Sequence, residues 1–187
     1  MLIEATALPD VKLLTPKRFG DNRGYFSEVY KQTALREAGL DLEFIQDNQS
    51  LSREVGTLRG LHYQAPPFAQ AKLVRVVTGR IYDVAVDIRV GSPSYGKWVG
   101  AELSADNLQQ LLVPVGFLHG FVTLEPDTTV LYKVTAPYSA AHDGGVAWDD
   151  PDIGIVWPLN SSAPVLSAKD GQQPRLKDLA NPFQYGA

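Results

Sequence analysis

Apolar and polar residues alternate along several short segments in the middle of the chain, which is the pattern of half-buried β-strands. In Ile81–Ile88 the even-numbered positions are apolar or aromatic, whereas Asp83 and Asp87 fall on the opposite face. Leu73–Thr78 is short and rich in β-branched residues, and the Gly79-Arg80 pair that follows it predicts a tight hairpin. Further strands are expected at Lys97–Leu103, Leu111–Val115, Gly120–Thr123 and Val130–Ala136.

Helical patterns are scarce. Thr33–Ala38, which ends at Gly39, is the best helix candidate, and Ser104–Leu108 is long enough for one turn. After Asp149 the chain is rich in proline, which predicts an extended tail that wraps over the rest. Short strands at this spacing indicate an all-β sandwich or barrel rather than βαβ units. With no repeat and no linker, we expect residues 1–187 to form a single domain.

Composition narrows the classes of function. The chain has 187 residues, no cysteine and a net charge of −4, so thiolate metal sites and structural disulfides are excluded. General nucleic-acid binding needs a clustered basic surface, and no Lys/Arg-rich run occurs. The first residues do not resemble a signal peptide, and no apolar run is long enough for a membrane helix. We therefore expect a cytoplasmic protein that does not bind membranes.

Two of the three histidines lie in informative contexts. The spacing Pro114-x-Gly116-x-x-His119 resembles the second motif of the cupin superfamily, whose members are small β-barrels. The first motif of metal-binding cupins supplies two histidines and a glutamate, but here Gln64 stands two residues after His62 and no acid follows before Lys72. Two imidazoles beside an ammonium are a poor divalent-metal site. The sequence therefore predicts a barrel without a metal, whereas His142 is expected at the surface.

A lysine can replace part of the chemistry of a metal. In a dry cavity the Lys72 ammonium can stabilise negative charge on a carbonyl oxygen, while a neutral His62 accepts a proton from the adjacent carbon. His62 alone would more often be a hydrogen-bonded interior histidine. Its combination with Arg59, Lys72 and His119 favours a catalytic site.

Many short motifs follow one another in order from Phe19 to Leu176. They are Asp21-x-Arg23-Gly24-x-Phe26-x-Glu28, Gln46-x-Asn48-x-Ser50, Leu58–Gln64, Gln70–Val74, Asp83–Asp87, Gly116–Phe121, Tyr132-Lys133, Trp148-x-Asp150-Pro151, Trp157-Pro158 and Leu166-Ser167-x-Lys169-Asp170. Together they resemble the dTDP-4-dehydrorhamnose 3,5-epimerases, which invert two carbon centres of a nucleotide-linked keto-sugar. The resemblance implies a cupin-like double-stranded β-helix, or jelly-roll barrel, with a few short helices.

The resemblance also implies a mechanism without a cofactor. His62 would be the general base, supported by Asp170, and Lys72 would stabilise the enolate oxygen at C4 of the sugar, with His119 close by. Tyr132 would return a proton from the opposite face of the ring. The reaction implied is the conversion of dTDP-4-dehydro-6-deoxy-D-glucose to dTDP-4-dehydro-L-rhamnose, in dTDP-L-rhamnose biosynthesis.

Residues that bind the substrate are implied by the same motifs. Arg23 and Arg59 would meet the diphosphate, since guanidinium groups bind phosphate oxygens in pairs. The remaining positions implied in binding are Phe26, Glu28, Gln46, Asn48, His119, Tyr138, which would stack on the thymine, Lys169, and Asp143, which stands where the family often has glutamate. Asp83 either lines the cavity or is structural, as Asp87 on the same face could also be.

The family commonly forms homodimers in which N-terminal strands pair with a neighbouring subunit, so Arg23 and Glu28 are expected to serve the site of the partner. Three other functions stay open. One is an epimerase that inverts a single centre of another dTDP-4-keto-deoxysugar, which deuterium labelling would distinguish. The second is a metal-dependent cupin, which elemental analysis would reveal. The third is a non-catalytic sugar-nucleotide binder, which would not depend on His62 or Tyr132.

Overall fold

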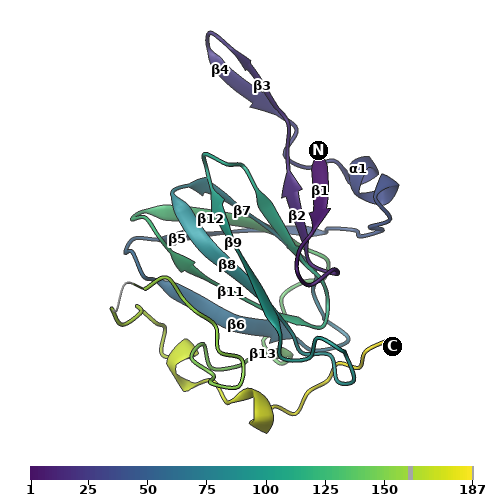
Figure 1. Cartoon of the computed structure of the whole chain (residues 1–187), viewed down its shortest axis with the longest axis vertical. Coiled ribbons are helices and arrows are strands. Elements are labelled where there is room, and N and C mark those ends of the chain that lie inside the picture. The colour runs from purple at the N-terminus through teal and green to yellow at the C-terminus, as the bar shows by residue number, and fades with distance from the viewer. Residues whose placement is uncertain (160–161, 187) are drawn as a thin grey trace.

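A computed structural model describes residues 1–159 and 162–186 of the chain (Figure 1). Within these residues the strands form two large antiparallel sheets and one hairpin. The six-stranded sheet contains, in spatial order, β1 (Leu2–Ala5), β2 (Lys12–Thr15), β10 (Gln110–Val113), β7 (Lys72–Thr78), β12 (Thr128–Val134) and β5 (Gln46–Ser52). The five-stranded sheet contains β13 (Asp143–Gly145), β6 (Leu58–Gln64), β11 (Phe117–Thr123), β8 (Arg80–Asp87) and β9 (Trp98–Ser104). The separate hairpin is β3 (Arg18–Asp21) and β4 (Gly24–Ser27).

The main core lies between the two large sheets. Val74 and Val130 from the six-stranded sheet pack there with Ile81, Ala85 and Phe121 from the five-stranded sheet. The odd-numbered residues of β8 face this main core, whereas the apolar even-numbered ones, such as Val84 and Val86, pack in a second core on the opposite face of the sheet. Two antiparallel sheets closed around a common core confirm the prediction of an all-β, cupin-like barrel.

The predicted hairpin at Gly79-Arg80 is wrong. The strands on either side of it, β7 and β8, are both present but belong to different sheets: β7 pairs with β10 and β12, and β8 with β9 and β11. Gly79 has a φ of +79°, and a Cβ there would lie 2.3 Å from Thr128 Oγ1. The glycine therefore permits a sharp corner at which the chain passes from one sheet to the other.

Helix is as scarce as expected, and it covers the outer faces of the barrel. The helix α1 (Gln32–Glu37) buries Leu35 against Leu14, Leu73 and Leu112 of the six-stranded sheet. The Ser104–Leu108 segment forms a turn, in which the Leu108 N–H donates to the Ser104 carbonyl.

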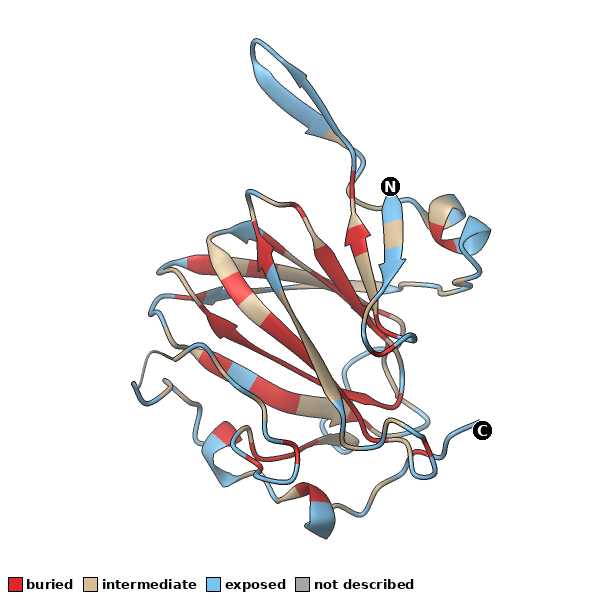
Figure 2. Cartoon of the chain, in the orientation of Figure 1, coloured by how far each residue is buried: buried red, intermediate tan, exposed pale blue. Residues whose placement is uncertain are grey.

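The C-terminal tail covers the outer face of the five-stranded sheet. It contains two short 3-10 helices, η1 (Asp170–Gln172) and η2 (Leu176–Asp178). Leu176 and Phe183 of the tail pack with Leu61, Val84 and Leu118 of the sheet. Figures 1 and 2 show the tail running along β6 and β13, with buried positions at intervals. The tail thereby carries Lys169 and Asp170 to the edge of the barrel.

The β3–β4 hairpin projects from the barrel, and every residue of it except Ser27 is exposed (Figures 1 and 2). Its surface includes three aromatic side chains, those of Phe19, Tyr25 and Phe26. An exposed cluster of aromatic residues on a monomer is typical of an interaction surface. None of the helices in the described parts of the chain has the length and apolar character needed to cross a membrane.

Candidate active site

The two histidines of the cupin-like motifs face each other on neighbouring strands. His62 of β6 is paired directly with His119, which lies within β11 rather than before it, because that strand begins at Phe117. The register shifts immediately after His119. There a Cβ on Gly60, whose φ is +134°, would lie 2.5 Å from Gly120 Cα. Only glycine permits this close approach, which sets the directions of both imidazoles.

His62 forms a hydrogen-bonded dyad with a carboxylate from the tail. Its Nε2 donates to Oδ1 of Asp170 at 2.5 Å, and Asp170 is buried. Burial acts to raise the pKa of Asp170, but hydrogen bonds from His62, Ser167 and the Gly60 N–H outweigh it and hold this pKa below its usual value. Asp170 therefore stays ionised and orients the imidazole, so that Nδ1 is the ring nitrogen left to accept a proton.

One cavity of about 400 Å³ is lined by all the predicted catalytic residues and by several of the predicted binding residues. The predicted residues that line it are Arg59, His62, Lys72, His119, Tyr132, Lys169 and Asp170. They come from both large sheets and from the tail, although they are far apart in the sequence. The structure thus brings together all four residues predicted to be catalytic.

Lys72 is half-buried at the beginning of β7, and the carboxylates that influence it in the described part of the chain act through their charge without a direct hydrogen bond. Burial lowers its pKa to about 8. The carboxylates of Asp143 and Asp83 act in the opposite direction, and Lys169 adds to the lowering. The amine is consequently a poorly solvated ammonium at neutral pH, which can stabilise negative charge that develops on a substrate oxygen.

Tyr132 enters the cavity from β12, with part of its ring packed against the main core. Burial raises the pKa of its phenol, while the charge of Arg59 partly opposes this and that of Asp143 adds to it. Tyr132 therefore remains protonated at neutral pH and can act as a proton donor.

Tyr138, Asp143 and Lys169 form a hydrogen-bonded cluster at the rim of the cavity. Tyr138 Oη donates to Asp143 Oδ2 at 3.0 Å, and the Lys169 ammonium pairs with the same oxygen. The Tyr138 side chain is largely exposed, so its ring is available to a planar ligand. The side chain of Asp143 is thus long enough to hold both neighbours.

Gln46 and Asn48 lie beside the cavity rather than in it. They occupy alternate positions of β5, the edge strand of the six-stranded sheet, and Gln46 Nε2 donates to Asn48 Oδ1 at 2.7 Å. Ser50, the next residue on this face, lines the cavity. The row of polar side chains therefore leads along β5 toward the site.

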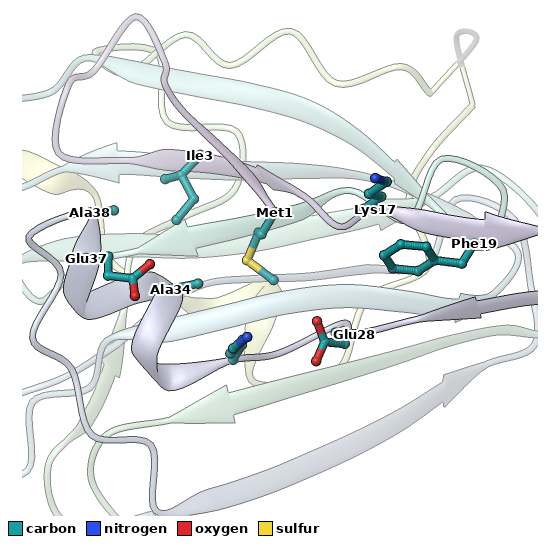
Figure 3. Close-up of a pocket in the computed structure, with 9 residues that line it drawn as sticks. Met1, Ile3, Lys17, Phe19, Glu28, Ala34, Glu37 and Ala38 are labelled. Carbon is teal, nitrogen blue, oxygen red and sulfur yellow. The ribbon is translucent and has the colours of Figure 1, made fainter.

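Three predicted binding residues lie away from both the cavity and its rim. Arg23 and Phe26 belong to the projecting hairpin, and Arg23 forms an exposed ion pair with Asp21 at 2.5 Å. Glu28 follows the hairpin and lines a different cavity of about 530 Å³, between β1, the base of the hairpin and α1 (Figure 3). Lys17 and Phe19 lie in the same cavity (Figure 3). Within one chain, these residues are separate from His62.

Sequence reasoning assigned no role to several residues that the structure places at the site. Ser50 and Ser167 both line the cavity. The period of two along β5, which Gln46 and Asn48 already indicated, would have included Ser50. Asp83, for which the sequence left open a place in the cavity lining or a structural role, hydrogen-bonds to His119. His142 lies elsewhere, half-buried, with its ring against Phe68.

The side chains of this cavity combine a base, an acid and a cation. The described parts of the chain contain no group of three His, Asp or Glu side chains placed to bind a metal ion. An oriented imidazole can remove a proton from carbon, an ammonium can stabilise the resulting enolate, and a phenol can donate a proton. This combination suits proton abstraction beside a carbonyl group.

Comparison with known proteins identifies the family. The model of the dTDP-4-dehydrorhamnose 3,5-epimerase family matches residues 5–178. The chain belongs to this family. It is 57% identical over 185 residues to the dTDP-4-dehydrorhamnose 3,5-epimerase of Sinorhizobium fredii, with 99% of this chain and 94% of the relative covered.

Solved structures of the family agree with the fold. The dTDP-4-dehydrorhamnose 3,5-epimerase of Bacillus anthracis, with TDP and pyrophosphate bound, is 51% identical and superposes with a TM-score of 0.90, over 93% of this chain and 98% of that one. The Legionella pneumophila enzyme, in complex with dTDP-4-keto-L-rhamnose, is 40% identical with a TM-score of 0.94, over 100% of this chain and 99% of that one. The family predicted from the motifs is thereby confirmed.

Proposed function

We propose that this enzyme converts dTDP-4-dehydro-6-deoxy-D-glucose to dTDP-4-dehydro-L-rhamnose, by inversion at C3 and C5, in dTDP-L-rhamnose biosynthesis. The observation that carries the proposal is the presence of the His62–Asp170 dyad, Lys72 and Tyr132 in one cavity of a chain that belongs to the epimerase family. We further propose that it acts in the cytoplasm, where sugar nucleotides are made and used.

The chemistry follows from the acidity of carbons beside a ketone. His62 Nδ1 removes the proton from such a carbon, the electron pair moves to the C4 oxygen, and Lys72 stabilises the enolate. Tyr132 then donates a proton to the same carbon from the opposite face, so the centre is inverted. Proton exchange with solvent restores both groups, and the same cycle at the second carbon completes the reaction. The carbons on both sides of C4 are activated by one ketone, so one set of residues serves both.

Proton NMR of the reaction in deuterated water tests this function. Each inversion replaces a carbon-bound proton with one from solvent, so deuterium is expected at both C3 and C5 of the product. Deuterium confined to one carbon would instead establish a single-centre epimerase. Nucleotide binding without any exchange would indicate a non-catalytic binder.

The fall in activity at alkaline pH should reflect the deprotonation of Lys72. The ammonium is the form that stabilises the enolate, so kcat/KM is expected to fall as pH rises through about 8, the lowered pKa of Lys72. Tyr132 does not limit this range because its pKa is raised. Once an anionic substrate is bound the ammonium is favoured, so the limb in kcat should lie at higher pH than the limb in kcat/KM.

Lys72→Arg is the control for this profile. Arginine keeps its charge throughout the measurable range, so the alkaline limb near pH 8 should disappear even though the altered geometry slows the reaction. If kcat/KM of Lys72→Arg still falls near pH 8, the fall is caused by the deprotonation of another group.

The nucleotide is proposed to lie along the rim of the cavity. Arg59 is exposed at the cavity wall and can contact the diphosphate, while the open ring of Tyr138 can stack on the thymine. Lys169, held by Asp143, supplies a second cation on the side of the tail. Gln46 and Asn48 extend the polar surface along β5.

We propose that the active form is a homodimer with exchanged N-terminal strands. The exposed, aromatic β3–β4 hairpin and the outer edge of β5, which no other strand of the described residues pairs with, are both features that pairing with a second copy would cover. Arg23, Phe26 and Glu28 then complete the nucleotide site of the partner, which accounts for their distance from His62 in a single chain.

Mixing two inactive variants tests this arrangement. In a heterodimer of Arg23→Ala and His62→Ala chains, one cavity would have an intact His62 and receive the intact hairpin from the other chain. Random assortment therefore restores roughly a quarter of the sites, because half of the dimers are mixed and each has one intact site. If Arg23 served its own chain, every site in the mixture would carry a defect and activity would not return. Differently tagged, co-expressed chains provide the heterodimer.

A further inference from the structure

Asp83 is a buried carboxylate next to the cavity, and the proton relay proposed above leaves it unused. It has no exposed surface, and it lies on the core face of β8 between Ile81 and Ala85. Its Oδ1 accepts from His119 Nε2 at 2.7 Å, whereas Oδ2 has no hydrogen-bond partner in the described part of the chain. A buried carboxylate with one unpaired oxygen is destabilising unless another charge compensates it. This placement therefore indicates a role beyond packing.

The Asp83–His119 pair repeats the geometry of the His62–Asp170 pair. In both, Nε2 of the imidazole donates to Oδ1 of an aspartate, and the two histidines are direct partners across β6 and β11. Both histidines line the cavity, and neither Nδ1 forms a hydrogen bond with the described residues. Asp83 thus binds Nε2 of His119 and leaves Nδ1 as the nitrogen available to a ligand.

Asp83 also acts on Lys72 through its charge. The charged and titratable groups around this lysine come from most of the elements that form the site, namely Arg59 and His62 of β6, Asp83 of β8, His119 of β11, Tyr132 of β12, Asp143 of β13, and Lys169 and Asp170 of the tail. Two of them, Asp143 and Asp83, raise the pKa of Lys72 against the effect of burial. Asp143 is already bound to Tyr138 and Lys169, whereas Oδ2 of Asp83 is uncommitted.

We propose that Asp83 is a positioning residue for enolate formation: its carboxylate pairs with His119 as an imidazolium, whose Nδ1–H then donates to the C4 oxygen of the sugar, and it supplies a buried negative charge near Lys72. The proposal rests on the epimerase function proposed above. Asp83 does not touch the substrate, and it acts through His119 and through its electrostatic field at the ammonium.

The test is Asp83→Asn, which keeps the shape of the side chain and removes its charge. We expect kcat to fall by about tenfold or more with a smaller change in KM, because the groups affected act on the enolate rather than on the nucleotide. The alkaline limb of kcat/KM should move to lower pH by about half a pH unit or more, because Lys72 loses one of the charges that favour its ammonium. Affinity for dTDP should be unchanged, which shows that the variant is folded.

Asp127→Asn is the matched control. It removes one negative charge from an exposed residue whose φ of +49° suits asparagine equally well, so its pH profile should equal that of the parent protein. An Asp83→Asn variant with an unmoved alkaline limb overturns the proposal, even if it is less active. If Asp83→Asn does not bind dTDP, His119→Gln is measured in its place. We expect this variant to lose kcat while its affinity for dTDP stays unchanged. An unchanged kcat would overturn the proposal. Absence of deuterium exchange in the parent protein would instead refute the epimerase function itself.

Discussion

Replacing His62 with alanine is expected to lower turnover by about 10³-fold or more while the affinity for dTDP stays within about threefold of the parent value. Among the described residues the imidazole is the cavity group that Asp170 orients as a proton acceptor, whereas the proposed nucleotide contacts are made by other side chains, those of Arg59, Tyr138 and Lys169. Exchange of both carbon-bound protons should be lost together, because one base serves both centres. Turnover is measured by NMR and dTDP binding by calorimetry.

Two variants make this result interpretable. His62→Ala removes the partner of the buried Asp170, which is expected to destabilise the fold by roughly 1–3 kcal/mol, so His62→Asn should also be measured because its amide can still donate to the carboxylate. His142→Ala removes an imidazole that lies outside the cavity and should leave turnover unchanged. Loss of dTDP affinity in His62→Asn, with normal turnover of bound substrate, would show that His62 binds rather than reacts.

Replacing Tyr132 with phenylalanine is expected to separate exchange from inversion. His62 can still remove a proton and return a solvent-derived one to the same face, so deuterium should enter the starting sugar nucleotide. The donor on the opposite face is missing, so net formation of the inverted product should fall by about 10²- to 10⁴-fold. Proton NMR in deuterated water follows both quantities in one sample.

The control for this variant is Tyr82→Phe. Tyr82 is also a half-buried strand tyrosine with a raised pKa, but it packs on the outer face of the five-stranded sheet. Its hydroxyl should therefore be dispensable for both exchange and inversion. Equal loss of exchange and inversion in Tyr132→Phe would indicate that the tyrosine assists proton removal, and the division of labour between two faces would have to be revised.

The sequence predicted the positions of the strands well but not how the strands pair. Alternation separates Asp83 correctly from the apolar face of β8, because the side-chain period of a strand is a local property, but it does not tell which of the two faces meets the interior of the barrel. Pairing is not local, since Gly79 makes an equally good hairpin turn or corner between sheets. Only the contact of Gly79 with Thr128, from a distant strand, distinguishes the two.

The residues of the site likewise fall into those that the local sequence predicts and those that it does not. Gln64 in place of a ligand histidine, together with Lys72, indicated the chemistry directly from neighbouring residues. The partnership of His62 with Asp170 joins positions separated by 108 residues, so only the family motifs could predict it. Arg23 stands in a family motif as clear as that of Arg59, but only Arg59 lines the cavity of the single chain, because the motif does not fix where the hairpin that carries Arg23 lies.

A crystal structure of the protein with dTDP-L-rhamnose bound tests the central claim most directly, because the C4 hydroxyl of this ligand takes the place of the reacting oxygen. The account predicts His62 Nδ1 on one face of the sugar, Tyr132 Oη on the other, and Lys72 Nζ within hydrogen-bond reach of the C4 oxygen. A sugar ring with both His62 and Tyr132 on the same face, or with Tyr132 out of reach of its carbons, would contradict the mechanism.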